Sequence, residues 1–179
     1  MRVIAGKWRG RPLVAPKGDA TRPTADRTRE ALFSMLTSRL GSFEGLAVAD
    51  LFAGSGALGI EALSRGAGSC LFVEQDRLAV EALRANLARL GTTGDVRAVS
   101  VLTLGPATAP VDLMMLDPPY GSGAAAVALD KLNRLGWIGA GTWISVETAA
   151  NETIDLAGFE TATGRTHGKA KITLLRRAA

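Results

Sequence analysis

The chain has 179 residues, 47% of them hydrophobic and 21% charged, which is the composition of one globular domain with a buried core. No stretch approaches the roughly 18 apolar residues of a membrane-spanning helix, and the first residues lack the apolar run of a signal peptide. We therefore expect a cytoplasmic protein that does not bind membranes. The single cysteine, Cys70, and the single histidine argue against an internal disulfide and against a metal site.

Positive charge is concentrated in the N-terminal quarter of the chain. Residues 1–45 contain nine Lys and Arg against four Asp and Glu, whereas the remainder contains 12 basic and 13 acidic residues. A local excess of basic residues, set among turn residues and Trp8, is typical of a surface that neutralises phosphates. We interpret this quarter as a basic extension that contacts nucleic acid; the alternative is a solvated basic face.

The extension is predicted to contain a hairpin and a helix. Residues 1–14 alternate around a turn at 8–12, which is typical of a short hairpin. Residues 24–40 carry apolar side chains three and four positions apart, with Pro23 before them and Gly41 after them. This spacing and these end residues predict a helix.

After the extension, predicted strands and helices alternate. Strands are predicted at 46–52, 69–73, 96–101, 112–116 and 143–147, and helices at 58–64, 77–90 and 125–135. The tail lacks a helical pattern, and residues 159–163 and 171–175 predict a closing antiparallel hairpin. Because alternating strands and helices imply right-handed crossovers, we predict a Rossmann-like α/β fold with a mostly parallel, seven-stranded sheet.

Residues 54–59, Gly-Ser-Gly-Ala-Leu-Gly, match the G-x-G-x-x-G pattern of a nucleotide-binding loop. Glu74 lies 20 residues after Gly54, at the end of the second predicted strand, where an acid accepts hydrogen bonds from ribose hydroxyls. These features alone fit NAD equally well. Asp50 favours S-adenosylmethionine, because a carboxylate beside the loop would repel a pyrophosphate and attract the ammonium and sulfonium charges of the methyl donor.

A second motif, Asp117-Pro118-Pro119-Tyr120, ends another predicted strand and should therefore lie at the same edge of the sheet. An exocyclic amine of a nucleobase is a poor nucleophile because its lone pair is delocalised into the ring. Asp117 and the carbonyl of Pro118 can accept its two N–H groups, and Tyr120 can stack on a flipped base. The tetrapeptide alone could be an ordinary turn; its pairing with the glycine loop predicts direct methyl transfer without a covalent enzyme intermediate.

The chain resembles the RsmD-type methyltransferases, which modify guanine N2 in small-subunit (16S) ribosomal RNA. The resemblance covers nearly the whole chain. Its most discriminating part is the Arg-Pro-Thr-x-x-Arg-x-Arg-Glu element at 22–30, which accompanies the basic segment at 2–13. Residues 50–66 and 117–120 contain the loops that many amino-methyltransferases share.

The resemblance implies a class I, S-adenosylmethionine-dependent rRNA (guanine-N2)-methyltransferase, with its basic extension at 1–45 and its catalytic domain at 46–179. The residues expected to be catalytic are Asp117, Pro118, Pro119 and Tyr120. Contacts to the cofactor S-adenosyl-L-methionine are expected from Asp50, Phe52, Ala53, Gly54, Gly56, Glu74, Gln75, Ser100 and Val101. Contacts to RNA are expected from Lys7, Arg9, Arg11, Arg22, Thr24, Arg27, Arg29 and Lys169. Many such enzymes have an Asp or Asn after the third strand for the adenine amine, whereas this chain offers only Ser100 and backbone groups there.

Several alternatives remain open at this point. The same chemistry could act on adenine or cytosine in DNA, although no separate sequence-reading domain is evident, or on a protein glutamine, which the basic extension disfavours. A nicotinamide dehydrogenase and a non-catalytic RNA-binding module are further hypotheses. A rise in melting temperature with S-adenosylmethionine but not with NAD would separate these classes. The expected partner is ribosomal RNA, either naked or in a partly assembled small subunit, and we expect a monomer.

Overall fold

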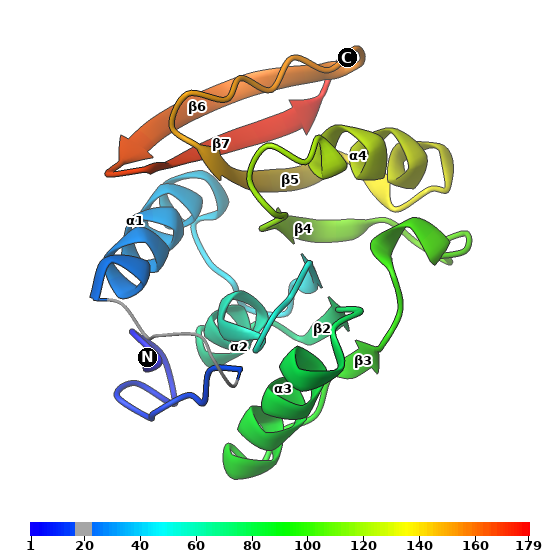
Figure 1. Ribbon diagram of the computed structural model, residues 1–179. Helices are drawn as coiled ribbons and strands as arrows, with labels where there is room; N and C mark the ends of the chain where they lie inside the picture. Colours follow the sequence, from blue (N-terminus) through cyan, green and yellow to red (C-terminus); the bar gives the residue numbers. More distant parts are fainter. Residues whose placement is uncertain (17–22) are drawn as a thin grey trace.

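The computed structural model describes residues 1–16 and 23–179 (Figure 1). The helices are α1 (Pro23–Leu40), α2 (Ala57–Ser64), α3 (Arg77–Arg89) and α4 (Ala124–Arg134), with a short 3₁₀ helix, η1 (Val101–Thr103). The strands are β1 (Ala47–Leu51), β2 (Ser69–Val73), β3 (Asp95–Arg97), β4 (Val111–Leu116), β5 (Ile138–Ala149), β6 (Phe159–His167) and β7 (Ala170–Arg177). None of these helices is long and apolar enough to cross a membrane.

In the described chain, the seven strands form one sheet in the order β3-β2-β1-β4-β5-β7-β6. Strands β1 to β5 pair in parallel, and β7 pairs antiparallel with both β5 and β6. The chain therefore winds outward from β1 in both directions. This arrangement leaves a switch point between β1 and β4, outside whose carboxyl ends open α/β sheets bind ligands. The predicted fold is confirmed, including its closing hairpin.

Helices cover both faces of the sheet (Figure 1). One face packs against α1, α2 and α3, and the other against α4 and η1. Successive strand residues point to opposite faces, so that Phe72 and Met115 belong to the first core while Val73 and Leu116 belong to the second. Because both faces are covered, the central strands are continuous apolar runs rather than alternating ones.

The N-terminal segment forms the predicted short hairpin, which packs on α2: the amides of Val3 and Leu13 donate to the carbonyls of Arg11 and Met1 at 2.9 and 2.8 Å. Its only antiparallel bridge among the described residues joins Arg2 and Pro12. The amides of Ile4 and Ala5 donate to the two carboxylate oxygens of Glu61 at 2.8 and 3.0 Å. Glu61 is 1% exposed, so these bonds satisfy a buried charge. The hairpin prediction is therefore confirmed, and Glu61 fixes the hairpin to α2.

The extension shares its core with the rest of the fold. Val3 and Leu13 are buried in the same cluster as α1, α2 and the central strands. The buried amide of Asn86, on α3, donates to the carbonyls of Val14 and Ser55 at 2.9 and 3.0 Å. One side chain therefore joins the extension, α3 and the glycine loop. A division at residue 45 stays a prediction.

Two strands differ in length from their predictions. Strand β3 ends at Arg97, and residue 101, predicted to be strand, begins η1, where the Ser100 hydroxyl accepts the Leu102 amide at 3.3 Å. Strand β3 lies at the edge of the sheet and pairs with a neighbour on one side only. Ser100 therefore turns the chain where the strand has little support. Strand β5 is longer than predicted because it lies between β4 and β7 and pairs with both.

Candidate active site

The two sequence motifs leave adjacent strands at the same edge of the sheet. Leu51, at the end of β1, pairs with Leu116, at the end of β4. The amide of Asp117 donates to the carbonyl of Leu51 at 3.3 Å. The glycine loop and the Asp117 loop therefore begin side by side, as the sequence predicted.

The glycine loop combines open space with close packing. Phe52 has φ of +58°, a conformation that is uncommon outside glycine and that occurs at ligand sites. A Cβ placed on Gly54 would meet no atom within 4 Å. A Cβ on Gly56 or Gly59 would come within 2.2 and 2.4 Å, respectively, of side chains from α3 and β2. Gly54 therefore lets a ligand approach the backbone, whereas Gly56 and Gly59 let α2 pack against its neighbours.

Glu74 holds the backbone of the glycine loop in place. Its Oε1 accepts the amide of Gly54 and its Oε2 accepts the amide of Asp76, both at 2.8 Å. An ionised carboxylate offers about four acceptor positions, so about two remain for ribose hydroxyls. The carboxylate is partly exposed, and Gln75 beside it is exposed.

Asp50 lies beneath the glycine loop. It does not reach the side of the loop that is open to a ligand. It is 1% exposed, and its Oδ2 accepts the amide of Gly59 at 2.9 Å. Among the described residues, its Oδ1 has no hydrogen-bond partner. Burial raises the pKa of Asp50 well above its usual range. A cation held at the loop would favour the charged carboxylate, which is the electrostatic role predicted for this residue.

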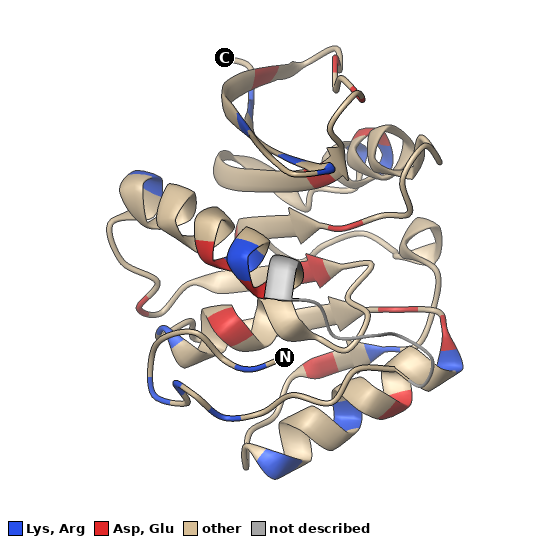
Figure 2. Ribbon diagram, turned by 60° about the vertical axis from the view of Figure 1, so that its left-hand side comes forward, with Lys and Arg blue, Asp and Glu red and all other residues tan. Residues whose placement is uncertain are grey.

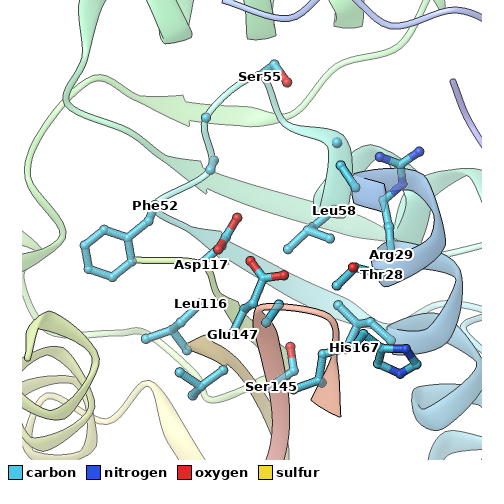
Figure 3. Close-up of a pocket in the computed structure, with 18 of the residues that line it drawn as sticks. Thr28, Arg29, Phe52, Ser55, Leu58, Leu116, Asp117, Ser145, Glu147 and His167 are labelled. Atoms are coloured by element: carbon cyan, nitrogen blue, oxygen red, sulfur yellow. The ribbon is translucent and has the colours of Figure 1, made fainter. Parts of the chain in front are cut away.

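A cavity of about 890 Å³ opens beside the two loops. Its walls come from the glycine loop, the Asp117 loop, α1, the end of β5 and the β6–β7 turn. Figure 3 shows Phe52, Asp117, Glu147 and His167 around this space. Segments from both ends of the chain therefore complete a site that begins with the two motifs.

Six predicted cofactor contacts are not among the described residues that line this cavity: Asp50, Gly56, Glu74, Gln75, Ser100 and Val101. Val101 is 3% exposed, and the Ser100 hydroxyl caps η1. Glu74 and Gln75 follow β2, and Ser100 and Val101 follow β3, whereas the cavity extends toward β4 and β5. The roles of all six residues as cofactor contacts stay predictions.

Asp117 faces a second carboxyl group, that of Glu147 at the end of β5 (Figure 3). The two side chains share a hydrogen bond. Asp117 is exposed at the edge of the cavity, yet partial loss of hydration raises its pKa, and burial together with the bond to Asp117 raises the pKa of Glu147 to about 9. Two adjacent carboxyl groups cannot both be ionised at low cost, so the pair favours sharing one proton.

The Asp117 loop is anchored at its far end. The amide of Gly121 donates to Glu152 Oε1 at 2.9 Å, and the same oxygen accepts the amide of Ala149 at 3.1 Å. Tyr120, at the mouth of the cavity, is 49% exposed. Burial of its hydroxyl and the nearby carboxylates raise the pKa of Tyr120 to about 12. The ring is therefore a neutral, accessible stacking surface.

The predicted RNA contacts fall into two groups. Figure 2 shows basic positions along the N-terminal segment; the exposed members of the predicted set are Lys7, Arg9, Arg11, Arg27 and Lys169. Arg22 lies outside the described residues, and for Thr24 only the backbone, in α1, is described.

Arg29 differs from the other predicted RNA contacts because it is buried. It is 4% exposed, donates to the carbonyl of Arg2 and to Asp26, and lies 3.8 Å from Glu61. Burial lowers the pKa of Arg29. A guanidinium bonded in this way is suited to holding the N-terminal segment on α1 and α2, and a direct phosphate contact does not fit its burial.

Several lining residues were not predicted as site residues from the sequence, among them Thr28 on α1 and Ser145 and Glu147 on β5. No local motif surrounds them, and only the alignment of β5 beside β4 brings Glu147 to Asp117. The signal available in the sequence for Glu147 was that it is an acid at the end of an apolar strand, and this strand lies next to the strand that leads to Asp117. In the described part of the chain, no group of His, Cys, Asp or Glu could hold a metal ion.

The fold and the paired loops define the class of the protein: a class I methyltransferase. The chain belongs to the family described as Conserved hypothetical protein 95, whose model matches residues 1–176. The RsmD-type family predicted from the sequence is confirmed by its relatives.

One relative is the Ribosomal RNA small subunit methyltransferase D of Escherichia coli K12, which is 38% identical over 150 residues, or 83% of this chain and 74% of the relative. A solved structure of a putative methyltransferase, yhhF, from Escherichia coli is 35% identical, with a TM-score of 0.83 over 100% of this chain and 98% of the other. Magnesium protoporphyrin IX methyltransferase from Synechocystis, solved with bound S-adenosylmethionine, shares the fold at 16% identity, with a TM-score of 0.67 over 90% of this chain and 87% of the other.

Proposed function

We propose that this enzyme transfers a methyl group from S-adenosylmethionine to the exocyclic N2 amine of a guanine in small-subunit ribosomal RNA. The observation that carries the proposal is the placement of the Asp117 loop beside the glycine loop. This placement occurs in a chain whose relative is named for methylation of small-subunit ribosomal RNA.

The described residues fit the methyl donor. Open space beside Gly54 admits a ligand to the loop backbone, and Glu74 keeps acceptor positions for ribose hydroxyls. Asp50 is buried under the loop, and a cation held there would favour its charged form, whereas a pyrophosphate would disfavour it. When bound, the donor supplies a methyl group activated by its positively charged sulfur. The protein's task is to hold that methyl group toward the Asp117 loop.

On the acceptor side, the loop orients the amine. Asp117 accepts one N–H and the carbonyl of Pro118 accepts the other, so the nitrogen lone pair faces the methyl group. Tyr120 stacks on the flipped base, which is worth about 1–3 kcal/mol per stacked base. As the new N–C bond forms, the bond from the methyl carbon to the donor's sulfur breaks and its electron pair stays on the sulfur. The nitrogen loses one proton, which the carboxylate of Asp117 can accept. The rate then depends on positioning and electrostatics.

Exposed basic residues bind the RNA around this site. We assign phosphate contacts to Lys7, Arg9, Arg11, Arg27 and Lys169, all of which are exposed. Arg22 and Thr24 keep their predicted roles as part of the same surface. We further propose a cytoplasmic monomer that acts on a partly assembled small subunit.

The test uses purified protein, S-adenosylmethionine with a labelled methyl group, and small-subunit ribosomal RNA offered naked and in small-subunit particles. Mass spectrometry of the nucleosides is expected to find N2-methylguanosine at one site. Labelled adenine or cytosine in a DNA substrate, or labelled glutamine in a protein substrate, with unlabelled ribosomal RNA, would overturn the proposal. A faster reaction on particles than on naked RNA is expected if the assembled subunit is the substrate.

A further inference from the structure

Glu147 occupies a position in the acceptor site that the two sequence motifs leave unexplained. It lines the cavity together with Asp117 and Tyr120, and its carboxyl group points toward that of Asp117 (Figure 3). It comes from β5, which pairs with β4 through Leu116 and Val146, so two parallel strands end with an acid at the same place. A strand-ending acid that only supported the fold would not need to face the reacting side of this cavity.

The pair has a preferred arrangement of its proton. Glu147, whose pKa rises to about 9, is the member of the pair that favours holding the shared proton and donating it to Asp117. Asp117 then keeps its negative charge for the amine of the substrate. The carboxyl group of Glu147 retains one further oxygen, which carries no proton and can only accept a hydrogen bond.

We propose that Glu147 is a specificity residue of the acceptor site, which donates its proton to Asp117 and accepts the ring N1–H of the target guanine. This inference rests on the proposed function. Asp117 and Glu147 together then accept two neighbouring hydrogens of the guanine edge, one on the exocyclic N2 and one on N1.

The chemistry of the bases explains why this arrangement selects guanine. In guanine, the exocyclic amine is flanked by a ring N–H. In adenine and cytosine, the corresponding ring nitrogen next to the amine is an acceptor. A ring acceptor placed against the free oxygen of Glu147 would leave both groups without a partner in a partly buried site, which is costly. The Asp117 loop alone can bind any exocyclic amine. A second group must therefore determine which base the enzyme accepts.

The experiment combines enzyme variants with an altered acceptor. The methylated guanine is first located in the small-subunit ribosomal RNA by mass spectrometry. The same RNA is then made with 2-aminopurine at that position, which keeps the N2 amine but has an acceptor at N1. For the wild-type protein, we expect kcat/KM on guanine RNA to exceed that on 2-aminopurine RNA by about tenfold to hundredfold.

The variants Glu147→Leu and Glu147→Gln separate recognition from packing. Leucine fills a similar volume without a hydrogen-bonding group, so we expect the ratio between the two RNAs to fall to within about threefold of unity, mainly through loss on guanine RNA. Glutamine keeps an N–H for Asp117 and an oxygen for the ring N–H, and we expect it to restore most of the selectivity. Glu160→Gln, an exposed position on β6, serves as the matched control and should behave as the parent.

The failures of the two proposals are distinguishable. If the wild-type protein methylates no guanine in ribosomal RNA, the proposed function fails before any variant is made. If it methylates the guanine but accepts 2-aminopurine equally well, the inference about Glu147 is wrong and the function stands. An unchanged ratio in Glu147→Leu, with normal S-adenosylmethionine affinity as a check on folding, would also overturn it, while the wild-type comparison remains decisive if that variant does not fold.

Discussion

The donor half and the acceptor half of the site are built in different ways. The donor half comes from one contiguous β1-α2-β2 unit and relies on backbone groups and glycines, with Glu74 bonding to the amide of Gly54. The acceptor half is assembled from α1, the ends of β4 and β5, and the β6–β7 turn, and it contains the Asp117–Glu147 pair. Binding of a common cofactor can thus be encoded locally, whereas substrate selection depends on charged groups that only the complete fold brings together.

The largest expected effect of a substitution lies in the acceptor half. Asp117→Ala should lower the single-turnover rate by at least about a hundredfold, because the amine loses the charged group that orients it. Its affinity for S-adenosylmethionine, measured by calorimetry, should stay within a few-fold of the parent. Asp155→Ala, at an exposed position, is the control. A variant that kept most of its rate would show that another group holds the amine.

Two arginines on α1 test how the acceptor half is supported. Arg29→Ala should destabilise the protein by about 1–3 kcal/mol in denaturant unfolding, because it removes the buried donor to the Arg2 carbonyl and to Asp26, while Glu61 keeps its ion pair with Arg65. Arg27→Ala, at an exposed position on the same helix, should leave stability unchanged and reduce the salt slope of RNA binding by about 0.7–0.9. Equal unfolding curves for the two variants would contradict the structural role of Arg29.

In the donor half, Glu74→Ala should weaken S-adenosylmethionine binding by about 1.5–3 kcal/mol, since it removes charged acceptors from ribose hydroxyls. Because Glu74 also bonds to the amide of Gly54, part of this loss would come from a less ordered loop. The rate at saturating donor should fall much less than in Asp117→Ala. If calorimetry found the parental affinity, Glu74 would not be part of the donor site. The contrast drawn between the donor half and the acceptor half would then be wrong.

The smallest expected effect concerns pH. The pKa of Glu147 rises to about 9 in the folded protein, so the folded chain binds more protons than the unfolded chain between the ordinary pKa of a glutamate and that value. Stability contributed by the neutral carboxyl is therefore complete at low pH and is lost as the pH rises through about 9. Between pH 6 and 9, the Tm of the wild type should fall relative to that of Glu147→Gln by on the order of 2–4 °C. Parallel curves would mean that Glu147 is ionised in the folded protein.

Much of the fold could be read from local patterns. Helix α3 and strand β2 matched their predictions closely, because apolar periodicity and flanking glycines act within a few residues. The end of β3 could not be read in this way, because the Ser100 hydroxyl turns the chain at the sheet edge. The hairpin at residues 1–14 could be read locally, but its attachment to α2 could not, because Glu61 is distant in sequence.

The same division applies to the site. Sequence alone determined the two loops, because each is a contiguous motif whose glycines, prolines and acids are required by the local backbone geometry. The order of the strands then places both loops at one edge of the sheet. Only the tertiary structure decided that Arg29 is an internal anchor and that Glu147 faces Asp117. An arginine or a glutamate has the same sequence signature on a solvated surface as in a buried pair. What distinguishes the two cases is burial and the partner across the fold, and both arise from contacts between segments that are far apart along the chain.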